Sequence, residues 1–490
     1  MENYVLLRLQ EEARRCLLCV DAPCTKACGK GDPARALRAI RFNNLNMAAR
    51  WLAGCKEPEL ARAEQACIHF DWPIRIRDVA AVLPAPVPEV PKKPSLAIDF
   101  CGLHCENPFF LASSAVSINY EMVARAFEAG WGGVFYKTIC LQEIKEVSPR
   151  FDAVGKPFMG FRNMEQLSEN PPEEDFNNIS RLKKDFPGKV VIASIMGQDD
   201  TQWVELAQMA EDAGADAVEL NFSCPQMRYA GMGSDVGQNS ELVTFLTANV
   251  KRNVKIPVIA KMTPNITHIS HPATGAFYAG ADAISAINTI KSVTLSEDAM
   301  VNDRHTVSGY SGRAVKPIAL RFILDLARNP VTGGTQLSGV GGIENWRDAL
   351  EFIQMGCRNV QVCTAVMQYG YRIIDDLILG LQNYMVERGV EHLSDLVGER
   401  VPQFVPASDL DRRTVVYPKV NHDVCIGCGR CVLSCSDGGH QALTFNPETR
   451  RPQLVGARCV GCHLCRLVCP TGAIGHGRRI ANKKTGRVSL

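Results

Sequence analysis

Short apolar, β-branched runs alternate with helical stretches from about residue 95 to residue 400. This alternation is typical of parallel strands joined by crossover helices. Several runs follow a glycine corner such as Ala213-Gly214-Ala215-Asp216, where glycine supplies a left-handed helix cap. We therefore predict a (β/α)8 barrel, with a doubly wound sheet as the alternative. The eight predicted strands are Pro108–Ala115, Gly132–Thr138, Val190–Met196, Ala217–Phe222, Pro257–Met262, Ala283–Thr289, Leu337–Gly341 and Asn359–Thr364.

The pattern changes on both sides of this barrel. Residues 1–79 predict a small helical module, with an amphipathic first helix, a helix over Pro33–Arg41 and another from Asn46 to Ala53. Residues 80–94 are rich in proline and predict an extended linker. Residues 415–490 predict a third module, with a hairpin through Leu443-Thr444-Phe445 and a basic, flexible tail from Gly477 to Leu490.

Composition is that of an ordinary globular chain, with 490 residues, 46% apolar and 22% charged. The length allows about three domains. The net charge of +2 gives no reason to expect nucleic acid or an anionic membrane as a partner. The chain shows neither a signal peptide nor an apolar run long enough for a membrane span, so we expect a cytoplasmic protein.

The twenty cysteines concentrate at the two ends of the chain. Six lie from Cys16 to Cys67 and eight from Cys425 to Cys469, while the other six are scattered singly. In a large chain without an export signal, such groups indicate metal sites rather than a disulfide framework.

The C-terminal group carries the most specific motif of the chain. Its spacing C-x2-C-x2-C-x3-C occurs twice, which is the bacterial ferredoxin signature for two [4Fe-4S] clusters. Because each fourth cysteine of this motif crosses to the other group, we predict two sets of ligands: Cys425, Cys428, Cys431 and Cys469, and Cys435, Cys459, Cys462 and Cys465. Ser436 stands where proline usually follows the fourth cysteine.

The N-terminal group begins with Cys16, Cys19, Cys24 and Cys28, spaced C-x2-C-x4-C-x3-C. We favour an iron-sulfur cluster here over zinc, which usually takes two ligand pairs separated by a longer loop. Cys55 and Cys67 follow two predicted helices later.

Polar residues stand at the carboxyl ends of the predicted barrel strands, where this fold places its chemistry. Lys137 and Lys261 would be costly there unless they face an anion or a cofactor. Glycines after strand seven and Thr364 after strand eight occupy the usual phosphate position of the fold. The pattern favours FMN over a bare structural loop.

The segment from Asp216 to Gln238 places a thiol, Cys224, directly after a buried strand. A buried cysteine acting as a small hydrophobe is the alternative. The polar stretch from Gln226 to Gln238 contains three glycines, which predicts a mobile loop able to close over a pocket.

Residues Asn221 to Pro225, Lys261 to Asn265, Asn288-Thr289 and Ser311-Gly312 resemble the FMN barrel of class 1 dihydroorotate dehydrogenases and, more closely, of dihydropyrimidine dehydrogenases. The orotate enzymes carry asparagine after the Cys-Pro pair, whereas this chain has Gln226. Over about residues 95–480 the chain is similar to catalytic subunits of bacterial NAD-dependent dihydropyrimidine dehydrogenases. The N-terminal module resembles the double-cluster module of glutamate synthase small subunits and dihydropyrimidine dehydrogenases.

The resemblance implies roles for individual residues. Cys224 would protonate C5 of uracil or thymine while hydride from the flavin reaches C6. Substrate contacts would come from Asn163, Asn221, Ser223, Asn288 and Thr289, and FMN contacts from Ala112, Ser113, Lys137, Thr138, Lys261, Ser311, Gly312, Gly341, Gly342 and Thr364. In the N-terminal module it implies a cluster on Cys16, Cys19, Cys24 and Cys67, which leaves Cys28 for a second site whose inner cysteines the chain lacks.

The electrons would arrive from another protein, because no G-x-G-x-x-G motif follows a predicted strand and opens a helix. The resemblance implies a flavoprotein subunit carrying FAD and an NAD(P)H site, within a hetero-oligomer such as a heterotetramer. Three other functions stay open: a dihydroorotate dehydrogenase, an electron-transfer subunit with a non-catalytic barrel, and a flavin reductase for another cyclic enamide.

Overall fold

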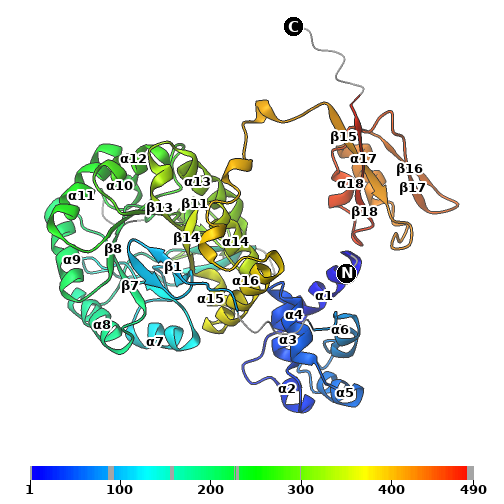
Figure 1. The fold of residues 1–490 in the computed structure, drawn as a ribbon, viewed down its shortest axis with the longest axis horizontal. Coiled ribbons are helices and arrows are strands. Elements are labelled where there is room, and N and C mark those ends of the chain that lie inside the picture. The colour runs from blue at the N-terminus through cyan, green and yellow to red at the C-terminus, as the bar shows by residue number, and fades with distance from the viewer. Residues whose placement is uncertain are drawn as a thin grey trace, which may run out of the picture. The chain divides into compact units, whose positions relative to one another are not determined.

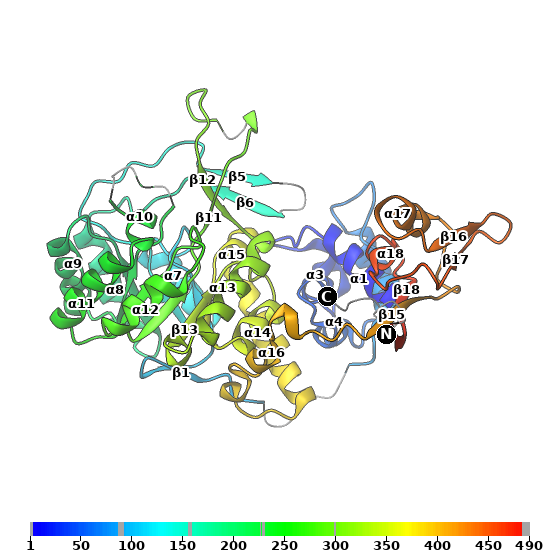
Figure 2. The ribbon, with the colours of Figure 1, turned by 90° about the horizontal axis from the view of Figure 1, so that it is seen from above.

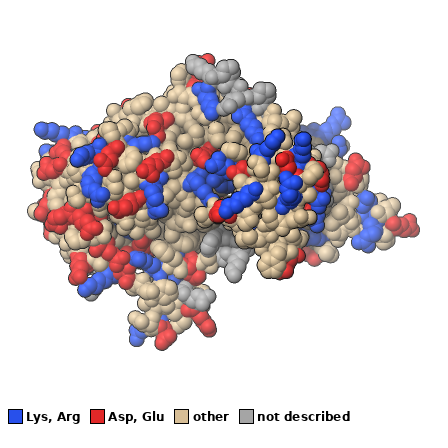
Figure 3. Space-filling view, turned by 90° about the horizontal axis from the view of Figure 1, so that it is seen from below, with Lys and Arg blue, Asp and Glu red and all other residues tan. Residues whose placement is uncertain are grey.

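The structure, a computed structural model, describes residues 3–86, 93–154, 159–225, 227, 231–297 and 300–482. It divides into two compact units. One unit holds Phe42–Asn44 and Pro88–Gln403, and the other holds the remaining N-terminal and C-terminal segments. Acidic and basic side chains are interspersed on the face shown in Figure 3. Among the helices of the described ranges, none has the length and apolar character that crossing a bilayer requires.

Eight parallel strands close into a barrel in the order β10-β13-β14-β3-β4-β7-β8-β9. All eight predicted strands are present, so the barrel prediction is confirmed and the doubly wound alternative is wrong. The strands are β3 (Phe109–Leu111), β4 (Gly133–Phe135), β7 (Val190–Ile195), β8 (Ala217–Asn221), β9 (Val258–Lys261), β10 (Ala283–Ala286), β13 (Gln336–Val340) and β14 (Cys357–Val362).

Helices surround these strands, as the ribbon in Figure 1 shows. Asn119 and Asp199 cap two of them by accepting hydrogen bonds from backbone N–H groups, and Gly130 follows the helix Tyr120–Ala129 in the left-handed conformation. The helices are α7 (Tyr120–Ala129), α8 (Pro172–Asp185), α9 (Asp200–Asp212), α10 (Ser234–Gly237), α11 (Ser240–Asn253), α12 (Ser270–Tyr278), α13 (Lys316–Arg328), α14 (Trp346–Gln354), α15 (Thr364–Tyr369) and α16 (Ile374–Arg388).

A second sheet of four strands, which the sequence did not predict, stands beside the barrel strands (Figure 2). Its antiparallel order is β11 (Ile290–Ser292), β12 (Ser308–Ser311), β6 (Gly160–Asn163) and β5 (Phe151–Val154). These strands have only three or four residues each and lie inside long connections, so their local pattern is too short to predict a strand. A hairpin of β1 (Ile98–Phe100) and β2 (Leu103–Cys105) precedes the barrel.

The N-terminal segment is helical, as predicted. Its helices are α1 (Asn3–Arg15), α2 (Pro23–Cys28), α3 (Pro33–Arg41), α4 (Leu45–Leu52), α5 (Glu57–Gln65) and α6 (Ile76–Val82). Helix α6 extends over the first residues of the linker predicted at 80–94. Residues 87–92 of that linker lie outside the described ranges.

The C-terminal module contains the predicted hairpin as β16 (Leu443–Asn446) and β17 (Arg451–Leu454). It also contains β15 (Thr414–Val420), α17 (Arg430–Gly438), α18 (Leu464–Leu467) and β18 (Ile474–Ala481). Strands β15 and β18 pair along their length, so Gly477 and the next residues form a strand rather than the predicted tail. Residues 483–490 lie outside the described ranges.

Candidate active site

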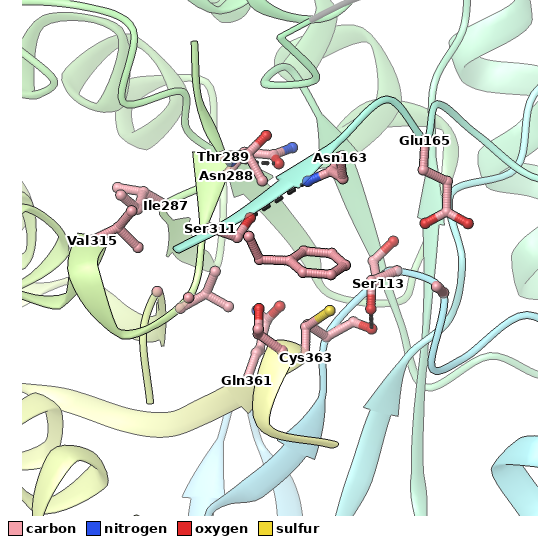
Figure 4. Close-up of a pocket in the computed structure, with 18 of the residues that line it drawn as sticks. Ser113, Asn163, Glu165, Ile287, Asn288, Thr289, Ser311, Val315, Gln361 and Cys363 are labelled. Carbon is pink, nitrogen blue, oxygen red and sulfur yellow. Dashed lines mark hydrogen bonds between the residues drawn. The ribbon is translucent and has the colours of Figure 1, made fainter. Parts of the chain in front are cut away.

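A cavity of about 130 Å³ opens at the carboxyl ends of the barrel strands. Strands β6 and β12 of the second sheet complete its wall through Phe161, Asn163 and Tyr310. Figure 4 shows Asn163 on one side of the cavity, with Gln361 and Cys363 opposite. The sequence-predicted residues that line it are Ala112, Ser113, Lys137, Thr138, Asn163, Asn221, Cys224, Lys261, Asn288, Thr289, Ser311, Gly312, Gly341, Gly342 and Thr364.

Cys224 is placed in this cavity by the end of β8. Strand β8 ends at Asn221, and the chain turns through Ser223 so that Cys224 lines the cavity with 5% of its surface exposed. The backbone N–H of Ser234 donates to the Cys224 carbonyl at 2.8 Å, which fixes the turn. A polar wall therefore surrounds a nearly buried thiol.

Ser223 differs from the prediction, because it is fully buried and does not line the cavity. Its hydroxyl donates to Asn221 Oδ1 at 2.7 Å and lies 2.9 Å from Asn288 Nδ2, which donates to it. Ser223 thus fixes the side chains of Asn221 and Asn288 without lining the cavity itself. The sequence could not distinguish a hydroxyl that supports the asparagines from one that contacts the substrate, because both roles need a hydroxyl directly after the strand.

The floor of the cavity is a buried hydrogen-bond network centred on Lys261. Its ammonium lies 3.4 Å from Glu219 and donates to Gln361 Oε1 at 3.2 Å. Gln361 in turn donates to Ser285 and Ser338 on neighbouring strands. A buried lysine is tolerated here because the opposite charge and the amide oxygen compensate for lost water.

Thr138 extends this network across β4, β7 and β8. Its hydroxyl lies 3.0 Å from both the Ser113 and Ser194 hydroxyls and accepts from Asn221 Nδ2 at 2.9 Å. Ser194 then donates to Glu219 at 3.1 Å. The polar side chains of the floor therefore hold each other in place.

A second lysine of the cavity, Lys137, is already paired with a carboxylate. Its ammonium lies 3.2 Å from Glu165, and the two side chains are 5% and 10% exposed. Glu165 follows β6 on the segment that completes the wall, and Figure 4 shows it near Ser113. The sequence analysis missed Glu165, since no strand was expected there.

Glycines shape the end of the cavity where β13 meets the start of α13. Gly341, Gly342 and Gly312 all have positive φ, at 134°, 75° and 92°. A Cβ atom on Gly342 would come within 2.8 Å of both the Gly312 carbonyl oxygen and the Lys316 nitrogen. Only glycine fits this close approach, and Gly312, Gly341 and Gly342 line this end of the cavity together with Arg313.

These features fit a flavin mononucleotide. A glycine-lined end with a nearby guanidinium suits a phosphate, and the polar floor with Lys261 suits the ring. Cys363, at the end of β14, lies in the same cavity, and burial raises the pKa of its thiol to about 11. A thiol with this pKa stays neutral at pH 7.

The stretch after Cys224 is partly helical rather than the predicted loop. Residues Ser234–Gly237 form α10, and Met232 and Val236 are buried. A Cβ atom on Gly233, which has a φ of 62°, would clash with the Cys224 carbonyl oxygen. Gln226, the residue that separated the two enzyme families in sequence, lies outside the described ranges.

The C-terminal cysteines gather as the ferredoxin spacing predicts. Cys435, Cys459, Cys462 and Cys465 line one small cavity, and the thiols near Cys431 are those of Cys428, Cys469 and Cys425. The pKa of Cys465 is raised to about 11, mainly by burial and further by the neighbouring cysteines. Cysteines this close bind as thiolates only if a cationic centre compensates for their charge, and an iron-sulfur cluster would supply one.

Four N-terminal cysteines line another cavity: Cys16, Cys19, Cys24 and Cys67. Burial raises the pKa of Cys24 to about 11, with Cys16 and Cys67 as further causes. These are the four cysteines that the resemblance groups around one cluster, and their arrangement fits that ligand set. Within the described ranges no three His, Cys, Asp or Glu side chains converge on a single metal ion.

Cys28 lies apart from this group. It is fully buried, and its sulfur is 3.4 Å from that of Cys55. The second site that the sequence left to Cys28 therefore contains a pair of thiols in the structure. The pKa of Cys55 is raised to about 12, mainly by burial and next by the neighbouring Cys28 side chain.

Comparison with known proteins places both main domains. The family model for dihydroorotate dehydrogenase matches residues 95–385, and a 4Fe-4S dicluster domain matches residues 418–475. A crystal structure of dihydroorotate dehydrogenase from Eimeria tenella, in complex with ferulenol, shares the fold. Its TM-score is 0.54 at 19% identity, over 64% of this chain and 91% of that chain.

Sequence relatives include the NAD-dependent dihydropyrimidine dehydrogenase subunit PreA of Escherichia coli. It is 51% identical over 391 residues, which cover 78% of this chain and 95% of the relative. The chloroplastic dihydropyrimidine dehydrogenase (NADP(+)) of Arabidopsis thaliana is 36% identical, over 66% of this chain and 80% of the relative. The catalytic subunit of dihydroorotate dehydrogenase B (NAD(+)) of Pyrococcus horikoshii is also 36% identical, over 62% of this chain and 98% of the relative.

The family match over the barrel and the long match to PreA agree with the cavity at the strand ends and with the ferredoxin spacing of the C-terminal cysteines. The chain is therefore an oxidoreductase that belongs to the dihydroorotate dehydrogenase family, together with the dihydropyrimidine dehydrogenase subunits that it resembles.

Proposed function

We propose that this chain reduces the 5,6 double bond of uracil and thymine, as part of pyrimidine catabolism. The observation that carries the proposal is one cavity in which Cys224 stands among Asn163, Asn221, Asn288 and Thr289. A neutral pyrimidine presents amide donors and acceptors along its edge, and asparagine side chains can match both. When bound, FMN supplies the hydride that reaches C6 of the pyrimidine.

Cys224 is the proposed acid, delivering its thiol proton to C5. The reaction needs the protonated thiol. Cys224 is 5% exposed, so bulk water has little access to it. The asparagines orient the ring, since Asn221 and Asn288 are themselves fixed through Ser223. Asn163 approaches from the second sheet and donates to Ser311 at 3.5 Å.

The ion pair between Lys137 and Glu165 favours a neutral substrate over an orotate-type anion. Glu165 already neutralises this lysine at 3.2 Å, so the ammonium offers little attraction to a substrate carboxylate. An anionic substrate would also have to approach the Glu165 carboxylate. This ion pair favours uracil and thymine over orotate, which is the nearest alternative substrate.

Lys261 and the glycine turns would hold FMN. Lys261 can place positive charge beside the electron-rich ring, and the backbone at Gly312 and Gly342 can bind the phosphate. The two C-terminal cysteine sets would hold [4Fe-4S] clusters, and Cys16, Cys19, Cys24 and Cys67 a third. Such clusters transfer single electrons, here from an NAD(P)H-oxidising FAD flavoprotein in a hetero-oligomer.

The experiment is steady-state turnover of uracil, thymine and orotate by the protein purified with its flavoprotein partner. The Cys224→Ala variant should lose about 10²- to 10⁴-fold of uracil kcat while retaining FMN absorbance, because only proton delivery is removed. Cys140→Ala is the matched control, since Cys140 is a buried cysteine of the same unit that does not line the cavity. Equal turnover by wild type and Cys224→Ala would refute the assignment and favour a non-catalytic barrel.

A further inference from the structure

Two cysteines of the N-terminal module, Cys28 and Cys55, have no place in the proposed electron pathway. Cys28 ends α2, and Cys55 stands in the turn between α4 and α5. They are 27 residues apart in sequence, yet their sulfurs lie 3.4 Å apart. Neither lines the cavity of Cys16, Cys19, Cys24 and Cys67.

The backbone holds the two sulfurs together from both sides. The Asp32 N–H, four residues after Cys28, donates to the Trp51 carbonyl at 2.9 Å, four residues before Cys55. Cys55 N–H donates to Leu52 O at 3.2 Å. The pair is therefore fixed by main-chain hydrogen bonds close to each cysteine.

Gly31 makes this approach possible. A Cβ atom at residue 31 would overlap the Cys55 sulfur and lie 2.9 Å from the Trp51 carbonyl oxygen. Residue 31 has no positive φ that would require glycine, so the space taken by the sulfur is the reason for it. The local sequence is thus adapted to two sulfurs in contact.

We propose that Cys28 and Cys55 are a reversible dithiol–disulfide pair rather than cluster ligands. The partly exposed Cys55 thiol first loses its proton to solvent, and its sulfur then attacks a low-molecular-weight disulfide such as oxidised glutathione, which forms a mixed disulfide and releases one thiol. The Cys28 thiolate then attacks the Cys55 sulfur and releases the second thiol. Two protein thiols are oxidised, one small disulfide is reduced to two thiols, and both protons pass to the released thiols.

Closing the pair would tie α2 to the turn that follows α4. The loop between the two cysteines contains α3 and α4, which would become a closed covalent ring. Helix α2 also carries Cys24, which lines the four-cysteine cavity. The disulfide would therefore stabilise the frame of the predicted cluster under oxidising conditions.

The test is differential alkylation of the full-length protein with its clusters, incubated without oxygen at a series of ratios of oxidised to reduced glutathione. Peptide mass spectrometry should find one crosslink, between Cys28 and Cys55, with the loss of two hydrogen atoms and full reversal by reduced glutathione. Cys140 and Cys357, which are buried cysteines of the barrel, should stay as free thiols in the same sample. A wild-type sample with no crosslink at any ratio would overturn the proposal.

Single variants distinguish the pair from a cluster site. Cys28→Ser and Cys55→Ser should abolish the crosslink, keep the wild-type iron content and leave the spectra of the reduced clusters unchanged. Loss of about four irons per chain in either variant would show that the cysteine is a cluster ligand, and would also overturn the proposal. Gly31→Ala should reduce the crosslinked fraction at every ratio because the added methyl group separates the sulfurs.

Discussion

The barrel mouth and the C-terminal cysteine module solve the same problem, the burial of charged or ionisable groups, in different ways. At the mouth, Lys261, Glu219 and Gln361 compensate one another through polar contacts that involve five strands. In the module, the small core consists of Cys431, Cys435 and Cys465 with three aliphatic residues, Ala442, Leu443 and Ile474. The barrel is thus preorganised by its own side chains, whereas the module depends on a metal centre to offset its thiolates.

The largest expected effect follows from that dependence. Cys465→Ala should remove one cluster, lower the iron content by about four atoms per chain and reduce partner-driven uracil turnover by roughly 100-fold or more. FMN content and turnover with an artificial donor that reduces the flavin directly should stay within about twofold, because the barrel holds its own shape. Iron and flavin analysis, with both assays, measures this. Parallel loss of FMN would contradict the independence of the two regions.

The stability of the barrel can be tested at its buried ion pair, Lys261 and Glu219. Lys261→Met leaves the Glu219 carboxylate, only 1% exposed, without its cation, which should cost about 3–5 kcal/mol of unfolding free energy. The Lys261→Met/Glu219→Gln double variant removes both charges and should recover most of that loss. Denaturant unfolding of the two variants gives the comparison. If the double variant is no more stable than the single one, the pair does not act as a unit.

A smaller change in the same cavity sharpens the substrate assignment. Glu165→Gln removes the carboxylate that pairs with Lys137 and keeps the side-chain shape. The unpaired ammonium should attract the orotate carboxylate, so the ratio of kcat/KM for orotate to kcat/KM for uracil should rise by about tenfold. Glu169→Gln is the matched control, because Glu169 pairs with Arg150 outside the cavity. An unchanged ratio in Glu165→Gln would remove the electrostatic argument against orotate.

The smallest effect concerns Asp175, which lies in the barrel unit with its side chain fully buried. Burial raises its pKa, despite hydrogen bonds from Asn170 and the Tyr136 hydroxyl. The folded state therefore favours the protonated Asp175 carboxyl. The contribution of this carboxyl to the free energy of unfolding is complete below its unfolded pKa and is lost as pH rises through its folded pKa. Asp175→Asn should abolish this dependence and gain about 1 kcal/mol at pH 8 relative to wild type. Thermal unfolding from about pH 3 to pH 8, a range that begins below the unfolded pKa, measures the difference, and identical pH profiles would contradict it.

The sequence by itself determined the barrel and most of the cavity. Apolar runs bounded by glycine corners specify strands through local patterning, and residues at the strand ends, such as Lys137, Cys224 and Asn288, must meet because parallel strands end at one rim. The ferredoxin spacing likewise grouped the C-terminal cysteines, since short loops fix which thiols can approach each other.

Only the tertiary structure decided which groups compensate one another. Glu165 pairs with Lys137 because β6 of the unpredicted second sheet brings it to the cavity wall, and Ser223 lies behind the asparagines rather than beside the cavity. The Cys28–Cys55 contact also required the fold, because the helices α3 and α4 separate the two residues in sequence. Such pairings depend on long-range packing, whose energy is not carried by any local pattern of residues.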